Sequence, residues 1–276
     1  MGIAGRLDPA WRKKTIASLL RGQKSDGSFG VPHYSKWKGA HWRLVSLVEL
    51  GVQARNPAAR AAAMNVLHWI SSPRHTAPVI NGLERRHASI WGNALAVGCR
   101  LGMANSPQVK YLAGVLLRSQ WPDGGWNCDR DPDAHHSSFH ESLAPIWGLV
   151  EYHRATGDAK ALNAARRAGE LLLEHRLFRS SRTAHVIDPE WLHIHWPHYW
   201  HYDFFHGLRA IAMLGKLDDP RTAEALDRLR FLKRPDGSWR ASGRRYWRMR
   251  GRFGVEVVNW GNAHQVVTPI ALAMLQ

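Results

Sequence analysis

The segment LRSQWPDGGW at residues 117–126 is the most informative about the fold, and it has two counterparts elsewhere in the chain. These are LRGQKSDGSF at 20–29 and LKRPDGSW at 232–239. Each reads as the end of a helix followed by Asp-Gly, a small residue and an aromatic residue. Asp-Gly is a strong turn signal, because glycine adopts positive φ at no steric cost. Turns of one kind, spaced about a hundred residues apart, indicate a repeated helical architecture in which each aromatic residue folds back onto the preceding helix.

Helical periodicity fills the intervals between these turns, and no run shows the alternation of a strand. The predicted helices are 9–22, 40–51, 57–71, 89–101, 107–119, 138–154, 159–176, 202–214, 219–233 and 264–275. Every second one is apolar on most faces, which is typical of a buried helix, whereas the others carry charge on one side. The sequence therefore predicts an all-α fold, a single α/α-toroid domain over residues 1–276 with about five outer–inner helix pairs.

Composition narrows the class of protein. The chain has 276 residues and a formal charge of 38 − 22 = +16, and its hydrophobic fraction of 45% excludes a disordered chain. Two cysteines, Cys99 and Cys128, exclude a disulfide scaffold and suit a reducing compartment, so we expect a cytoplasmic protein. The basic charge favours an anionic small molecule, or peripheral contact with an anionic membrane surface. No nucleic-acid-binding motif accompanies it, so a nucleic-acid partner is not expected.

The turn from Gln120 to Trp126 resembles the QW repeats of squalene cyclases and the related repeats of protein prenyltransferase β subunits. The resemblance covers most of the chain at low identity. It implies a terpene cyclase-like or prenyltransferase-like enzyme with an isoprenoid-handling cavity at one end of the toroid. Two alternatives share the fold: a metal-dependent or acid–base lyase or hydrolase of an acidic sugar, and a non-catalytic binding domain.

The resemblance also implies that the inner helices begin at one mouth, where free N–H groups favour anions. Histidines and carboxylates stand in those first turns. The expected catalytic residues are His41, His140, Glu141 and Asp203. Aligned on Gly124-Gly125-Trp126, His140 falls at the essential acid of squalene cyclases, with Glu141 beside it. Because imidazolium is a weak acid for an alkene, Glu141 is a second candidate for the proton donor, with His140 as its hydrogen-bond partner. Replacing His140 or Asp203 is then expected to abolish turnover with little change in melting temperature.

A metal site is predicted in the same region. His201, Asp203 and His264 follow the order of the prenyltransferase zinc ligands, without the thiolate. Nitrogen and oxygen ligands suit a divalent metal, either Zn or the harder Mg or Mn. The alternative is that His201 and Asp203 only cap a helix. The loop from Asp129 to Asp133, with acidic residues at every second position, is a further candidate against the alternative of a solvated loop.

Aromatic residues mark the expected substrate pocket, because their faces stabilise carbocations and stack on apolar chains. The connection 191–201 is dense in Trp, Tyr and His and is predicted to form a pocket wall, with a plug for the mouth as the alternative. The expected substrate-binding residues are Trp42, Trp91, Asn93, Trp196, Trp200, Tyr202, Arg244 and Arg245. The two arginines belong to a segment at 240–252 that is suited to gripping a phosphate. RNA or an acidic membrane face are the other partners for that segment.

Overall fold

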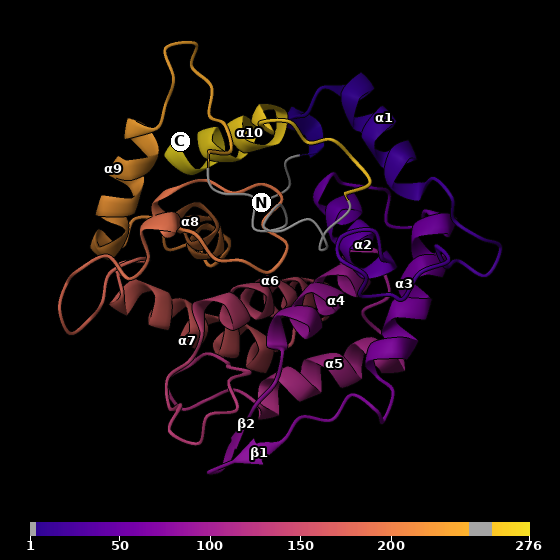
Figure 1. The fold of residues 1–276 in the computed structure, drawn as a ribbon, viewed down its shortest axis with the longest axis horizontal. Helices are drawn as coiled ribbons and strands as arrows, with labels where there is room; N and C mark the ends of the chain where they lie inside the picture. The colour runs from indigo at the N-terminus through magenta and orange to yellow at the C-terminus, as the bar shows by residue number, and fades with distance from the viewer. Residues whose placement is uncertain (1–3, 243–255) are drawn as a thin grey trace.

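The computed structural model of the protein describes residues 4–242 and 256–276 (Figure 1). Within those ranges lie ten α-helices, three short 3₁₀ helices and one hairpin of two-residue strands. The α-helices are α1 (Pro9–Leu20), α2 (Ala40–Glu49), α3 (Pro57–Ile70), α4 (Ala88–Arg100), α5 (Pro107–Arg118), α6 (Phe139–Thr156), α7 (Ala159–Glu174), α8 (Phe204–Met213), α9 (Ala223–Phe231) and α10 (His264–Leu275). The remaining elements are η1 (Ala4–Arg6), β1 (Val79–Ile80), β2 (Leu83–Glu84), η2 (Pro189–Leu192) and η3 (Pro220–Thr222). All ten predicted helices are present, so the all-α prediction is confirmed, whereas the hairpin was not predicted.

From α1 to α9 the helices alternate between more exposed and more buried, as their composition predicts. The last helix departs from the pattern, since α10 is predicted to be buried but buries only Val266, Val267, Ile270, Ala271 and Met274. Every residue of α2 is buried, and so are most residues of α4, α6 and α8. In contrast, α1 buries only Thr15 and Leu19, and α9 buries only Ala225 and Leu229. In Figure 1, α1, α3, α5, α7 and α9 follow one another around the outside, and α6 and α8 lie nearer the middle. The functional side chains of the inner helices are therefore held by buried elements.

The first and last elements of the chain lie side by side. Arg6 donates a hydrogen bond to the side chain of Gln276 at 3.2 Å. The rings of Trp11 and Trp260 meet edge-on, with centroids 6.3 Å apart. Figure 1 shows α10 next to α1 accordingly. In the described ranges, no helix is both long enough and apolar enough to cross a membrane.

The aromatic residue of each Trp-containing turn folds back onto the helix before it, which confirms that prediction. The indole N–H of Trp126 donates to the carbonyl of Leu116 at 3.1 Å, and the indole N–H of Trp239 donates to Leu229 at 2.7 Å. Each bond spans ten residues and satisfies a carbonyl near the C-terminus of an outer helix, a group that has no partner within the helix.

A glutamine in two of the turns ties one outer helix to the next. The Gln120 amide donates to the carbonyls of Gly124 at 2.6 Å and Ala164 at 2.8 Å. Gln23 repeats the pattern with Gly27 and Ala58, at 3.1 and 2.8 Å. Each of these two turns therefore ends one outer helix and also hydrogen-bonds to the following one.

Candidate functional site

Five aromatic residues form a hydrophobic cluster separate from the main core. Trp37, Trp42 and Tyr199 are buried, and the half-buried Tyr34 and Trp200 pack against them. Trp37 and Tyr199 stack with centroids 4.0 Å apart, and Trp42 meets them edge-on at 4.8 and 5.5 Å. These five residues, called the aromatic cluster below, come from the first turn of α2, the segment before it and the segment before α8. Aromatic rings from segments far apart in sequence therefore meet where two inner helices begin.

Unpaired polar atoms lie beside the aromatic cluster. His41 is 1% exposed and its ring lies 4.6 Å from that of Trp42. Burial, with a smaller contribution from His33, lowers the pKa of His41 to about 3, and its Nε2 has no hydrogen-bond partner among the described residues. The amide nitrogen of Asn93 donates to the carbonyl of Tyr199 at 3.2 Å, while its oxygen Oδ1 has no partner in the same ranges. Buried polar atoms normally find partners, so these two atoms are exceptions among the described residues.

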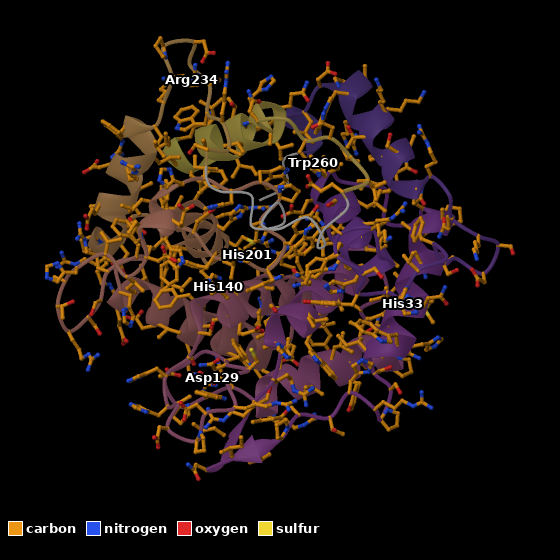
Figure 2. All side chains as sticks on the ribbon, in the orientation of Figure 1. His33, Asp129, His140, His201, Arg234 and Trp260 are labelled. Atoms are coloured by element: carbon orange, nitrogen blue, oxygen red, sulfur yellow. The ribbon has the colours of Figure 1, made fainter. Side chains whose placement is uncertain are left out.

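His140 and His201 lie close together (Figure 2). Their ring centroids are 5.8 Å apart. Nδ1 of His140 accepts the backbone N–H of Tyr202 at 2.8 Å, so the neutral ring carries its proton on Nε2. Burial lowers the pKa of His140, and burial, with a smaller electrostatic contribution from the neighbouring His140, lowers the pKa of His201 to about 2. His140 is therefore a neutral hydrogen-bond donor, which does not suit the role of a strong acid.

Asp203 is fully buried and holds the start of α8. Its Oδ2 accepts both the backbone N–H and Nδ1 of His195, each at 2.9 Å, and its Oδ1 accepts the backbone N–H of His206 at 2.9 Å. Burial by itself raises the pKa of Asp203, but the interactions with His206 and His195 outweigh it and lower the pKa. The carboxylate is thus occupied as a helix cap, the alternative interpretation noted from the sequence.

The three predicted metal ligands are not grouped at coordination distance. His264 is exposed, and its Nδ1 lies 2.9 Å from Oδ1 of Asn262. In the described part of the chain, the only group of three such ligand types is His87, Cys128 and Glu141. The acidic loop is exposed, and the Asp129 and Asp131 side chains accept N–H groups two residues further on, at 3.0 and 2.9 Å. These are turn-forming hydrogen bonds.

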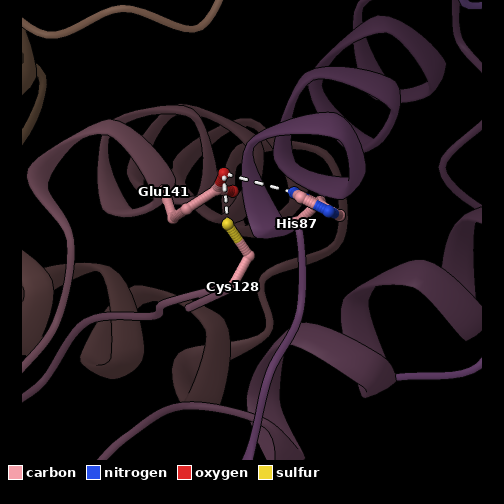
Figure 3. Close-up of side chains that lie close together, drawn as sticks. All are labelled: His87, Cys128 and Glu141. Carbon is pink, nitrogen blue, oxygen red and sulfur yellow. Dashed lines mark hydrogen bonds and ion pairs between the residues drawn. The ribbon is translucent and has the colours of Figure 1, made fainter. Parts of the chain in front are cut away.

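Glu141 brings His87 and Cys128 together, and the sequence did not predict this (Figure 3). The Cys128 thiol donates to Oε1 of Glu141 at 3.4 Å, and Nδ1 of His87 lies 3.7 Å from the same oxygen. The other oxygen accepts the backbone N–H of Ser89 at 2.8 Å. Hydrogen bonds with Cys128 and Glu141 raise the pKa of His87 to about 10. A signal existed in the sequence, since Cys128 closely follows Trp126 of the repeat and His87 immediately precedes an inner helix.

A cavity of about 250 Å³, called the Tyr34 cavity below, opens beside this group. Its lining includes Tyr34, Trp69, Trp91, His87 and three arginines, Arg85, Arg86 and Arg130. Burial raises the pKa of Tyr34 to about 12, with further contributions from the charges of Glu141 and Cys128. Tyr34 therefore belongs at once to the cavity and to the aromatic cluster, and it lies near the His87–Cys128–Glu141 group.

Three of the remaining predicted substrate residues belong to the main core, and one of them, Trp91, also lines the Tyr34 cavity. Trp91 lines the Tyr34 cavity, with the guanidinium of Arg86 4.3 Å from its ring centroid. Trp196 is 2% exposed within the main core, and the buried Tyr202 donates its hydroxyl to the carbonyl of Leu177 at 2.6 Å. Both support the fold. Arg244 and Arg245 lie outside the described residues.

No protein-family model matches the chain, and no curated protein matches it. Among solved structures it is similar to the type II terpene cyclase MstE from Scytonema in the apo form, with 14% identity over 96% of this chain and 98% of that chain, and a TM-score of 0.37. It is also similar to a variant of that cyclase in complex with the substrate geranylgeranyl dihydroxybenzoate, with 15% identity, 96% and 95% coverage and a TM-score of 0.33. A further variant, in complex with the product merosterolic acid A, has 15% identity, 96% and 94% coverage and a TM-score of 0.34. The chemistry of the site rests on this chain's own residues.

Proposed function

We propose that this protein is an enzyme of the terpenoid cyclase type, which binds an isoprenoid chain with an anionic end at the Tyr34 cavity and the aromatic cluster. The observation that carries the proposal is the position of Tyr34. Its ring centroid lies 5.2 Å from that of Trp42 in the aromatic cluster and 6.5 Å from that of Trp69 in the cavity wall. A ligand in the cavity therefore contacts a ring that itself packs against the aromatic cluster.

The aromatic cluster suits an isoprenoid for two reasons. Its half-buried rings, Tyr34 and Trp200, offer rigid apolar surfaces to a flexible hydrocarbon, and the buried rings hold them in place. Their faces also attract positive charge, and a carbocation in a desolvated site gains on the order of 2 kcal/mol from such a contact. Trp200 contributes here because it is half-buried, and its ring already lies 5.6 Å from the ammonium of Lys36.

Arginines suit the anionic end of the ligand. Arg86 is paired with Glu84, and Arg85 donates to the carbonyl of Ala134 at 2.7 Å. Arg130 is exposed and forms no ion pair with the described residues, so it is available to a diphosphate or carboxylate. In this proposal Arg130 is the principal anchor, and Arg85 and Arg86 add to the positive potential.

His140 then acts as a hydrogen-bond donor through Nε2. Its ring lies among those of Trp191, Trp200 and His201, at 5.8, 5.6 and 5.8 Å between centroids. A donor in that setting orients an oxygen atom of the substrate or a captured water molecule against the aromatic faces. His41 beside Trp42 and Asn93 beside Tyr199 add the unpaired Nε2 and Oδ1 atoms to the cluster's surroundings.

The test is turnover by the purified protein. Farnesyl and geranylgeranyl diphosphate, and the two corresponding alcohols, are incubated with it and the extracts are analysed by gas chromatography and mass spectrometry. We expect cyclised or isomerised products, reduced about tenfold or more in Trp200→Leu, which corresponds to about 1.4 kcal/mol of transition-state stabilisation. Phe231→Leu, an exposed aromatic residue on α9, is the matched control and is expected to match the wild type.

Two results would contradict the proposal. One is that all four isoprenoids are returned unchanged while none of them quenches tryptophan fluorescence in a saturable way. The other is turnover of an acidic oligosaccharide by a protein that leaves every isoprenoid intact, which would favour a sugar lyase or hydrolase.

A further inference from the structure

Three side chains from separate parts of the chain converge next to the Tyr34 cavity. His87 immediately precedes α4, Cys128 lies in the connection between α5 and α6, and Glu141 is in the first turn of α6. Each offers one ligand atom, and the three atoms all lie within 4.8 Å of one another (Figure 3). They are not among the ligands that the sequence predicted.

We propose that His87, Cys128 and Glu141 bind a zinc ion, with a fourth coordination position open to the Tyr34 cavity. The donor set is a thiol sulfur, an imidazole nitrogen and a carboxylate oxygen, the three kinds of ligand that zinc takes in proteins. Magnesium and calcium prefer oxygen ligands alone, so a site containing a cysteine disfavours them.

The distances fit a tetrahedral ion. Zinc bonds of about 2.3 Å to sulfur and about 2.0–2.2 Å to nitrogen and oxygen place neighbouring ligand atoms about 3.3–3.6 Å apart. Sγ of Cys128 lies 3.4 Å from Oε1 of Glu141, and Nδ1 of His87 lies 3.7 Å from that oxygen. An ion therefore binds all three after small side-chain movements, and it replaces the protons of the Cys128 thiol and of the His87 ring nitrogen, which are released to solvent.

The surroundings of Glu141 support the site. The backbone N–H of Ser89 donates to its Oε2 at 2.8 Å, which leaves Oε1 directed at Cys128 and His87. Hydrogen bonds of this kind orient metal ligands and are part of their affinity. The carboxylate is fixed before any ion arrives, so little ordering of Glu141 is needed on binding.

The burial of the three ligands indicates where the fourth coordination position of the zinc ion lies. Glu141 is 5% exposed and Cys128 is half-buried, whereas the side chain of His87 is 65% exposed and lines the cavity. Three protein ligands and one open position are typical of catalytic rather than structural zinc. The fourth ligand is then water or an anionic oxygen of the molecule in the cavity. Zinc binding itself does not depend on that molecule being an isoprenoid.

The experiment measures zinc directly. Full-length protein is freed of metal with a chelator and titrated with Zn²⁺ in competition with a chromophoric chelator, and elemental analysis gives the stoichiometry. We expect one zinc per chain in the wild type, and an affinity reduced about a hundredfold or more in Cys128→Ser and His87→Gln, since each loses a direct ligand. Cys99→Ala, which removes the other thiol from a buried position in α4, is the matched control and is expected to bind normally.

Cobalt substitution identifies the sulfur ligand. Co²⁺ in the wild type and in Cys99→Ala should show a thiolate-to-metal charge-transfer band, and Cys128→Ser should lack it. If Cys128→Ser folds poorly, His87→Gln still tests the site. The side chain of His87 is largely exposed to solvent, so its replacement is expected to leave the fold intact.

Three outcomes would overturn the proposal: no stoichiometric zinc, zinc retained at full affinity in both Cys128→Ser and His87→Gln, or zinc lost in His201→Ala but not in those two. A protein that binds zinc as expected but turns over no isoprenoid would leave this site standing and contradict only the proposed function.

Discussion

The backbone N–H of Tyr202 donates a 2.8 Å hydrogen bond to Nδ1 of His140. This single bond joins the segment before α8 to the first turn of α6, across 62 residues of sequence. It also fixes the tautomer of His140, since a nitrogen that accepts an N–H cannot carry the ring proton. His140 therefore connects α6 to the segment before α8, in addition to its proposed role as a hydrogen-bond donor to the ligand.

His140→Leu should lower the free energy of unfolding by about 1–3 kcal/mol, because the Tyr202 N–H loses its acceptor in a largely buried setting. His140→Asn should lose less, since its side-chain oxygen can replace Nδ1. Urea denaturation of the two variants and the wild type measures the difference. Equal losses in both variants would show that packing of the ring, and not the hydrogen bond, determines the effect.

Asp203→Ala should be strongly destabilising. Its carboxylate is 0% exposed and accepts three hydrogen bonds, so truncation leaves buried donors unpaired at a cost of about 3–5 kcal/mol. This differs from the expectation drawn from the sequence, in which replacing Asp203 affects turnover alone. Asp236→Ala, an exposed turn carboxylate, is the control and should change the melting temperature much less. A normal melting temperature for Asp203→Ala would contradict its role as a buried cap.

Stability should fall as the pH falls below about 6.5. His41 has a folded-state pKa of about 3, well below the ordinary value of the unfolded chain. The unfolded state therefore binds the proton first, and the stability that is present above pH 6.5 is lost as the pH falls towards 3. Burial lowers the pKa values of His198 and His206 as well, so they act in the same direction.

The slope of the unfolding free energy against pH tests the contribution of His41 individually. Below pH 6.5 each such histidine contributes up to about 1.4 kcal/mol per pH unit. His41→Leu should reduce the slope by about that amount when unfolding free energies are measured by urea denaturation between about pH 4 and 6.5. An unchanged slope would mean that His41 becomes protonated in the folded protein as readily as in the unfolded chain.

Gly124→Ala should destabilise the protein more than Gly237→Ala. Both glycines have positive φ, at 98° and 78°, so both substitutions strain the backbone. A Cβ at Gly124 would lie 2.6 Å from the carbonyl oxygen of Arg167 on α7, whereas a Cβ at Gly237 meets nothing within 4 Å. Thermal unfolding of the two variants measures the difference, since Gly237→Ala introduces backbone strain alone and Gly124→Ala adds a steric clash to it. Equal melting temperatures would contradict the tight contact between this turn and α7.

Local features of the chain could be predicted because local chemistry determines them. Asp8 caps α1 by accepting the N–H of Trp11 at 2.7 Å, as an aspartate before a helical pattern predicts. The Asp-Gly turns and the return of Trp126 and Trp239 onto their helices follow from turn chemistry in the same way. The alternation of buried and exposed helices follows from the distribution of apolar residues.

The site was harder to predict because it depends on contacts between distant segments. The side chains of His87 and Glu141 meet across 54 residues, and no periodicity reveals that the residue before α4 faces the first turn of α6. Asp203 illustrates a second difficulty, since a carboxylate at a helix start serves equally as a cap or as an acid. Residue type alone also cannot show that Trp91, unlike Trp196, reaches from the core to the lining of the Tyr34 cavity.

Locating a bound isoprenoid by crosslinking tests directly whether the ligand occupies the Tyr34 cavity. A prenyl diphosphate carrying a photoreactive diazirine is crosslinked to the protein, and the labelled peptides are identified by mass spectrometry with and without excess farnesyl diphosphate. Labelling is expected on peptides that contain Tyr34, Trp69 or Trp91, and it should be lost with the competitor. Competed labelling confined to residues 180–187, which line a different cavity, would contradict it, and so would labelling that farnesyl diphosphate does not displace.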